Sequence, residues 1–135
     1  MVANTNHRVV IDASAILSYI LPDEVTPKSV MNVFRKYSKD EVIFLAPTLL
    51  IYEIGNALKS AVKQKRLNQI SATDIIEDFK QLDITFADPN IIENIDLSIK
   101  HNLSFYDASY LAIALENNAK LLTLDNKLQE CLKTK

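Results

Sequence analysis

Two of the acidic residues in this sequence follow short apolar runs, where a carboxylate can do chemistry. Asp12 comes directly after Val9-Val10-Ile11, and Asp125 comes directly after the run 120–124. Short apolar runs of this kind predict strands that are buried on both faces of a parallel sheet. Because open α/β sheets bind ligands at the carboxyl ends of their strands, we expect both carboxylates at a site.

Two further acids, Glu53 and Asp107, lie near predicted helix starts. Glu53 falls in a long helix predicted for residues 48–67, and Asp107 leads into a helix predicted for residues 108–117. In a parallel sheet with right-handed crossovers, these helix starts can share the edge at which the strands end. We therefore expect the four carboxylates to converge. Glu53 lies within a largely apolar helix face, so it is unlike an acid that simply faces solvent.

Each acid also has a structural interpretation. Either Asp12 or Ser14 can cap the helix that follows the first strand, and Asp125 can cap the last helix. Asp107 in a first helical turn complements the helix dipole. Acids rarely cluster unless they are paired or bound to a metal, so the expected convergence favours a functional interpretation.

A cluster of carboxylates without histidine predicts a particular kind of metal site. Neighbouring carboxylates raise one another's pKa, and a divalent cation relieves their repulsion. All-oxygen ligands favour Mg²⁺ or Mn²⁺, which can activate water for attack on a phosphodiester. Ser14 and Thr123 can orient a carboxylate or a metal-bound water, or can serve only local structure.

The composition excludes several other classes of site. Gly55 is the only glycine, which argues against phosphate-binding loops and dinucleotide fingerprints. A single cysteine, Cys131, excludes an internal disulfide framework and a Cys-rich zinc site. His7 and His101 are far apart in sequence, so histidine-based metal chemistry is poorly supported.

The net charge of −2 indicates that the chain is no general polyanion binder, so nucleic acid must be contacted locally or through metal. Basic residues form either a guide for a phosphate backbone or a solvated helix face: Arg8, Lys59, Lys63, Lys65 and Arg66. No apolar run is long enough to span a bilayer. The polar segment Met1 to His7 lacks a signal-peptide pattern, so we expect a cytoplasmic protein.

The order of the predicted elements indicates the fold class. Strands are predicted at residues 8–11, 42–46, 83–87 and 120–124, and helices at 13–21, 28–38, 48–67, 72–82, 90–101, 108–117 and 127–133. Thr26 and Ser71 are the predicted N-caps of the second and fourth helices. Strands that alternate with helices predict a three-layer α/β/α domain with a mostly parallel central sheet, spanning residues 1–135 as a single domain.

Four motifs in this order give the chain a family resemblance. They are Val-Val-Ile-Asp12-Ala-Ser14, Tyr52-Glu53-Ile-Gly-Asn56-Ala-Leu, Phe105-Tyr106-Asp107-Ala-Ser-Tyr-Leu-Ala and Leu-Leu-Thr123-Leu-Asp125. The pattern resembles a PIN domain and, more narrowly, the VapC-type toxins of bacterial and archaeal toxin–antitoxin pairs. Any one motif is weak, but four in register over nearly the whole chain are specific.

The resemblance implies a ribonuclease that depends on Mg²⁺ or Mn²⁺. It implies that the acidic quartet is Asp12, Glu53, Asp107 and Asp125, and that these carboxylates hold the metal. It also implies a homodimer, an RNA substrate and inhibition by a small cognate antitoxin. Asn56 matches a common polar position of the family, where it can support Glu53, approach the site or only make a helix–helix hydrogen bond.

Two alternatives belong to other functional classes. A signalling receiver domain typically has adjacent acids after its first strand, but here Ala13 follows Asp12, and Lys127 follows Asp125 rather than ending a strand. A catalytically inactive PIN-like scaffold would only bind a partner. The complete quartet argues against the scaffold, since such a domain gains nothing from four converging charges.

Overall fold

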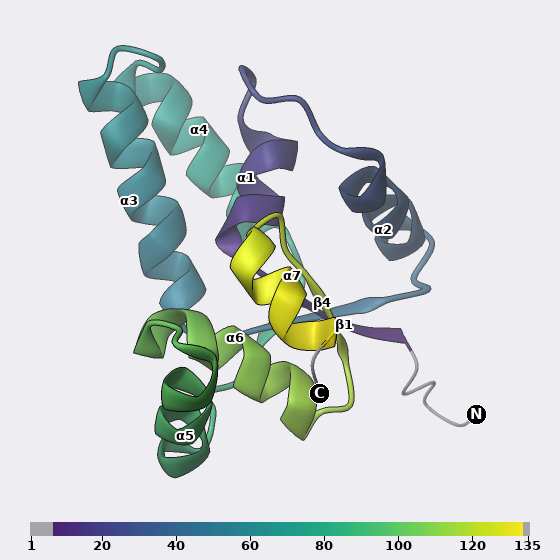
Figure 1. Ribbon diagram of the computed structural model, residues 1–135. Helices are drawn as coiled ribbons and strands as arrows, with labels where there is room; N and C mark the ends of the chain where they lie inside the picture. Colours follow the sequence, from purple (N-terminus) through teal and green to yellow (C-terminus); the bar gives the residue numbers. More distant parts are fainter. Residues whose placement is uncertain (1–6, 134–135) are drawn as a thin grey trace.

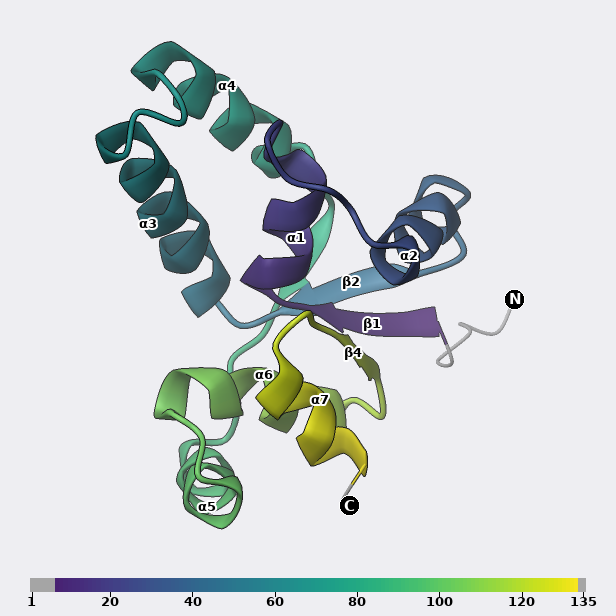
Figure 2. The same ribbon diagram turned by 45° about the horizontal axis from the view of Figure 1, so that its top comes forward.

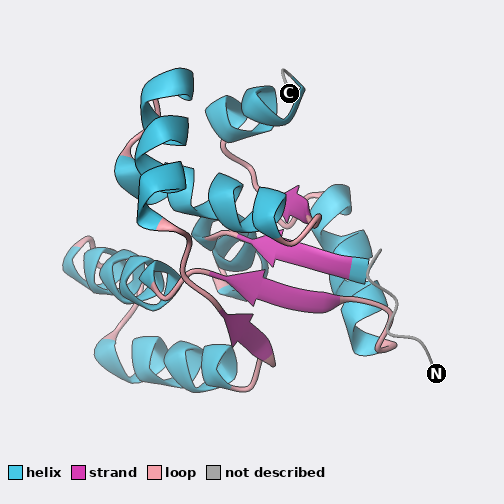
Figure 3. Cartoon of the chain, turned by 90° about the horizontal axis from the view of Figure 1, so that it is seen from below, coloured by secondary structure: helices cyan, strands magenta, loops and turns pink. Residues whose placement is uncertain are grey.

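The centre of the molecule is a four-stranded sheet in which all strands are parallel (Figure 1). The computed structural model describes residues 7–133. The strands are β1 (Arg8–Ile11), β2 (Ile43–Ala46), β3 (Ile84–Phe86) and β4 (Lys120–Leu122). Their order is β3-β2-β1-β4, so β1 lies between β2 and β4. The carboxyl ends of the strands therefore share one edge of the sheet (Figure 3).

Helices cover both faces of the sheet, as predicted for a three-layer α/β/α fold. They are α1 (Ala13–Ile20), α2 (Lys28–Ser38), α3 (Leu49–Lys63), α4 (Gln69–Lys80), α5 (Ile91–His101), α6 (Phe105–Glu116) and α7 (Asn126–Lys133). Helices α1 to α4 lie on one side of the sheet, and α5 to α7 lie on the other (Figure 2). None of the helices in residues 7–133 is long and apolar enough to cross a membrane.

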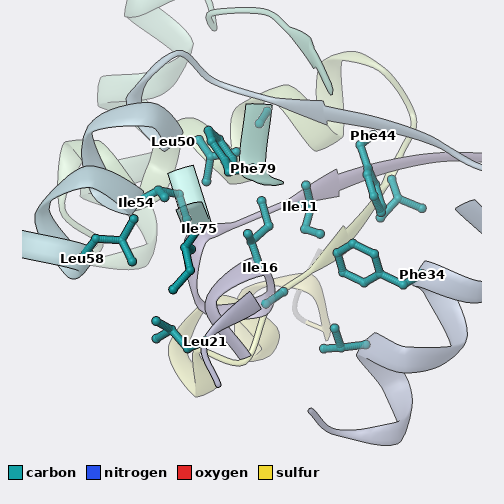
Figure 4. Packing of buried hydrophobic residues seen from close by; sticks show 14 residues of the cluster. Ile11, Ile16, Leu21, Phe34, Phe44, Leu50, Ile54, Leu58, Ile75 and Phe79 are labelled. Carbon is teal, nitrogen blue, oxygen red and sulfur yellow. The ribbon is translucent and has the colours of Figure 1, made fainter. Parts of the chain in front are cut away.

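Two hydrophobic clusters, one on each face of the sheet, explain why β1 is continuously apolar. Val9 and Ile11 join the cluster under α1 to α4, whereas Val10 joins the cluster under α6 and α7. In β2, Phe44 packs into the first cluster and Leu45 into the second. Figure 4 shows the first cluster, in which side chains from the four covering helices meet the sheet. Val9, Val10 and Ile11 of β1 are therefore buried on both faces of the sheet, whereas Phe86 at the end of the edge strand β3 is partly exposed.

The predicted element boundaries hold within a few residues, but two predicted N-caps are wrong. Helix α4 begins at Gln69 because the Asn68 side chain, and not Ser71, caps it by accepting a hydrogen bond from the Ser71 amide at 2.8 Å. Thr26 instead donates its hydroxyl to the Ser18 carbonyl at 2.6 Å, so it ties the loop to α1. The long predicted helix ends early, at Lys63.

Only some of the tyrosines lie in the core. Tyr110 is buried, and Tyr37 stacks on Phe44 with a ring separation of 4.6 Å. Tyr52 and Tyr106 are exposed, because each lies on the outward side of its helix, next in sequence to an acid of the quartet.

Gly55 lies inside α3 with nothing within 4 Å of the position that a Cβ would occupy. A glycine in a helix interior lowers stability relative to alanine because the unfolded chain has more freedom to lose. We expect Gly55→Ala to raise the free energy of unfolding by about 0.5–1 kcal/mol. Urea denaturation measures this change, and a loss of stability would contradict the open space around Gly55.

Candidate active site

Asp12 lies at the carboxyl end of β1 and is almost completely buried, with 5% of its surface exposed. Its Oδ1 accepts hydrogen bonds from the Ser14 hydroxyl at 2.6 Å and from the Ala15 amide at 3.1 Å. Its Oδ2 accepts a hydrogen bond from the Thr123 hydroxyl. Asp12 therefore caps α1, as was predicted for a structural role. Only Oδ1 takes part in the cap, whereas Oδ2 binds Thr123 from a distant part of the chain.

Ser14 and Thr123 connect Asp12 to the segment that follows β4. The strand predicted to reach Leu124 ends at Leu122, so Thr123, Leu124 and Asp125 form a short loop. The Ser14 hydroxyl accepts from the Leu124 amide at 2.9 Å, and the Thr123 hydroxyl accepts from the Asp125 amide at 3.0 Å. Each hydroxyl donates to Asp12 and accepts from the loop, so the two hydroxyls hold the loop against the end of β1.

Asp125 follows this loop and is exposed to solvent. Its Oδ1 accepts a hydrogen bond from the Leu128 amide at 3.0 Å, and its carbonyl accepts from the Gln129 amide at 3.1 Å. Asp125 thus caps α7, as its structural interpretation proposed. The second carboxylate oxygen has no hydrogen bond within residues 7–133 and remains available for a ligand.

Glu53 is brought to the same edge by α3, which begins just after β2. Asp88 fixes this helix start, since its carboxylate accepts from the Thr48 amide at 3.1 Å and the Thr48 hydroxyl at 2.9 Å. Glu53 is half-buried, and its Oε1 accepts a hydrogen bond from the hydroxyl of Tyr110 on α6. The sequence offered no sign of this tyrosine's role beyond its position three residues after Asp107.

Asp107 lies in the first turn of α6, where its carboxylate complements the helix dipole as expected. The Ser104 hydroxyl caps this turn by accepting from the Asp107 amide at 3.0 Å. The buried Asn94 side chain of α5 donates to the Phe105 carbonyl at 3.0 Å and so ties the start of α6 to α5. Helix α6 leads into β4, and its first turn brings Asp107 near enough to Asp125 and Glu53 for their charges to affect one another.

The electrostatics show that the four carboxylates act on one another. Burial raises the pKa of Asp12 above its ordinary range, and the charge of Asp125 raises it further, while hydrogen bonds partly offset both effects. Burial likewise raises the pKa of Glu53, with added repulsion from Asp107 and Asp12. The pKa of Asp107 is raised by burial and then by Asp125. Each of the four acids predicted from the sequence therefore affects, or is affected by, the charge of at least one other acid of the quartet.

The donor set fits a hard divalent cation. It consists of carboxylate oxygens without thiolate or imidazole, and such sets suit Mg²⁺ and Mn²⁺. Within residues 7–133, no three of the acidic, histidine or cysteine side chains lie close enough to form a ready-made ion site. Metal binding is supported by the pKa values of Asp12, Glu53 and Asp107, which are all raised. Burial is the largest cause, but repulsion between the carboxylates contributes, and a bound cation would remove that repulsion.

Several sequence candidates lack the contacts that were predicted for them. Asn56 is exposed and makes no hydrogen bond within the described residues, so a bond that supports Glu53 or joins two helices is not observed. Arg8 begins β1 and lies roughly 13 Å from Asp12 at the strand rise of about 3.3 Å per residue. Arg66 follows the far end of α3 and pairs with Asp23 at 2.8 Å. The predicted basic patch does not gather around the acids.

Lys127 is a cation near the site that the sequence did not single out for this role. It lies in the first turn of α7, donates to the Asn102 carbonyl, and its charge opposes the rise in the pKa of Asp107.

Comparisons with known proteins agree with this architecture. The sequence profile of the PIN domain family matches residues 9–131. The chain is 29% identical over 127 residues to Ribonuclease VapC3 of Pyrobaculum aerophilum, covering 91% of this chain and 93% of that protein. It is 31% identical over 121 residues to Ribonuclease VapC1 of Mycobacterium tuberculosis, covering 88% of this chain and 86% of that protein.

Solved structures show the same fold. The crystal structure of PAE2754 from Pyrobaculum aerophilum is similar with a TM-score of 0.72 at 25% identity, over 94% of this chain and 85% of that chain. Mycobacterium tuberculosis VapC20 has a TM-score of 0.57 at 11% identity, over 91% and 94% of the two chains, which supports the fold alone. The chain belongs to the PIN domain family and, within it, to the VapC-type ribonucleases. The signalling receiver alternative is therefore wrong.

Glu53 generates a prediction about pH. Its folded-state pKa is raised above the ordinary value of 4.5, so its ionisation destabilises the folded protein once the pH exceeds that value. Glu53→Gln keeps an oxygen for Tyr110 but removes the charge. In metal-free buffer with chelator we expect this variant to be more stable than wild type at pH 7.5, and the advantage to disappear at pH 4.

Urea denaturation at the two pH values measures the effect. Glu41→Gln, at an exposed position outside the quartet, is the matched control, and we expect no such pH-dependent gain for it. A Glu53→Gln variant that is less stable than wild type at pH 7.5 would contradict the repulsion inferred at the site.

Proposed function

We propose that this protein is an endoribonuclease that cleaves RNA with Mg²⁺ or Mn²⁺, and that it is the toxin of a type II toxin–antitoxin pair. Its VapC-type relatives support the nuclease activity. The observation that supports the proposed site is the convergence of Asp12, Glu53, Asp107 and Asp125 at the carboxyl edge of the sheet. We take residues 1–135 to act as one cytoplasmic domain that works as a homodimer.

In the proposed mechanism the carboxylates hold the cation, and the surrounding residues hold the carboxylates. Ser14 and Thr123 fix the orientation of Asp12 from both of its oxygens, and Tyr110 fixes one oxygen of Glu53. When bound, the ion supplies an activated water and stabilises the leaving oxygen of the phosphodiester. The burial of Asp12 keeps bulk water from competing for its oxygens.

A divalent cation also explains how an acidic protein can bind RNA. The net charge is −2, and the carboxylates alone would repel a phosphate backbone. Cations held by Asp12, Glu53, Asp107 and Asp125 would offset this negative charge and so would allow a phosphate backbone to approach the site.

Replacement of a metal-holding carboxylate provides the direct test. We expect Thr123→Val, which removes a hydrogen bond to Asp12, to lower the rate of RNA cleavage by roughly 10- to 100-fold. We expect Asp12→Asn to lower this rate by more than that, because it removes the carboxylate itself. Chelator should abolish wild-type cleavage, and added Mn²⁺ should restore it. Cleavage of a labelled RNA under single-turnover conditions measures all of these rates.

Asp74→Asn, at an exposed position of α4 outside the quartet, is the matched control, and we expect it to retain most activity. Wild-type cleavage rates in Asp12→Asn would overturn the assignment of the quartet. Calorimetry that detected no Mn²⁺ binding to the wild-type protein would overturn the metal assignment. An absence of RNA cleavage by the same protein would favour the inactive-scaffold alternative.

A groove between α3 and α4 supports the proposed antitoxin partner. Its walls are mostly apolar and include Leu58, Val62 and Ile76, and Lys59 and Lys63 lie along it. Gly55 lines the same groove, where no part of the chain requires its small size. An apolar groove with basic residues suits a segment that has apolar and acidic side chains. We propose that the antitoxin docks such a segment here and that Gly55 leaves room for it.

A pair of substitutions at Gly55 tests this docking site. We expect Gly55→Leu to fill the groove and weaken inhibition by the antitoxin, while RNA cleavage by the free toxin stays within about twofold of wild type because no catalytic group changes. Gly55→Ala, which adds one methyl group, is the control. Growth after coexpression with the small reading frame next to the toxin gene measures inhibition, and full inhibition of Gly55→Leu would exclude this groove.

A further inference from the structure

The exposed face of α3 carries four side chains in one line, which we call the α3 stripe. It consists of Tyr52, Asn56, Lys59 and Lys63. At 100° per residue, all four fall within about 60° of one another around the helix axis, and the buried residues of α3 lie on the opposite side. All four side chains are exposed, and Tyr52 exposes 72% of its surface. The stripe is therefore open to a ligand along its whole length.

The α3 stripe begins at the proposed active site and leads away from it. Tyr52 directly precedes Glu53, and Asn56 lies one turn beyond, where it neighbours both of them on the helix surface. Asn56 makes no hydrogen bond within residues 7–133, so its amide can still donate and accept. Helix α3 runs outward from the edge of the sheet (Figure 2). At a rise of 1.5 Å per residue, the stripe is about 16 Å long from Tyr52 to Lys63.

The charge on α3 is positive everywhere beyond the site. Glu53 is the only acid of this helix, and neither Lys59 nor Lys63 forms an ion pair within residues 7–133. The two lysines also border the groove between α3 and α4, and the residues that line this groove include no acid. An aromatic ring followed by a line of positive charge is the combination that binds a single strand of nucleic acid.

We propose that the α3 stripe binds single-stranded RNA beside the bond that is cut. A base stacks on Tyr52, Asn56 forms a hydrogen bond with the neighbouring nucleotide, and Lys59 and Lys63 contact the phosphates that follow. The inference rests on the RNA substrate of the proposed function and names the path of the strand. A single strand is needed because the bases of a duplex are stacked inside it and cannot also lie on a protein ring.

The path along α3 also bears on inhibition. Lys59 and Lys63 border the groove that we propose for the antitoxin. An acidic segment in that groove would neutralise the charges that hold the RNA phosphates, so RNA and the antitoxin would compete for the two lysines. Inhibition would then act on substrate binding even though the groove holds none of the four acids.

Fluorescence anisotropy tests the stripe by binding alone. The probe is a labelled single-stranded RNA of roughly 12 nucleotides, and Asp12→Asn with Mg²⁺ is the reference protein, so that the RNA stays intact. We expect Tyr52→Ala in this background to weaken binding by about 5- to 100-fold, because a base loses its stacking partner. Tyr52→Phe keeps the ring and should restore the affinity of the reference. A double-stranded RNA of the same length should show no such loss with Tyr52→Ala.

The two lysines are tested by the dependence of binding on salt. Replacing both Lys59 and Lys63 with alanine should weaken binding and make the slope of log affinity against log salt less steep by about 1.4, or about 0.7 for each lost phosphate contact. Lys28→Ala combined with Lys36→Ala is the matched control, because both lysines are exposed on α2 and the same charge is removed. We expect the slope of this control to equal that of the reference protein.

Single-turnover cleavage by protein with Asp12 intact separates binding from chemistry. The double variant of Lys59 and Lys63 should raise the protein concentration at half-maximal rate more than it lowers the maximal rate. The proposal is overturned if the reference protein does not bind the RNA, or if Tyr52→Ala and the double variant, shown by circular dichroism to be folded, bind it as the reference does. The expected losses of binding without any cleavage by wild type would support the stripe and refute the proposed nuclease activity.

Discussion

The arrangement of the acidic residues at the carboxyl edge of the sheet depends on burying the Asp12 carboxylate at the end of β1. A buried charge is costly unless it is hydrogen-bonded, and Asp12 meets this requirement with three donors from two different parts of the chain. Because Thr123 and Ser14 each bond both Asp12 and the loop after β4, satisfying the carboxylate also places Asp125. One local electrostatic requirement thereby joins the beginning and the end of the chain.

Burying these carboxylates also lowers the free energy of unfolding when no cation is bound. Three of the four acids have raised pKa values, so their ionised forms are held together against burial and mutual repulsion. The two hydrophobic clusters that pack on the faces of the short parallel sheet stabilise the fold enough to offset this unfavourable free energy. A site of this kind gains stability when a cation binds, and ligand binding and folding are therefore coupled.

The layers of the fold separate two apolar surfaces. The groove with Gly55 lies among the helices on one side of the sheet, and the exposed isoleucines of α5, such as Ile91 and Ile99, lie on the other side. The acids occupy the edge between them, where both layers begin.

Much of this protein could be predicted from its sequence, because the signals are local. Apolar runs before Asp12 and Asp125 predicted the strands, their alternation with helices predicted the layers, and the strand ends predicted where acids meet. The partners of those acids are contacts between distant segments, so only the tertiary structure decided that Tyr110 donates to Glu53 and that Thr123 donates to Asp12. It likewise decided that Arg66 pairs with Asp23, which lies 43 residues earlier in the chain, because that contact forms only when α3 and the loop after α1 are brought together.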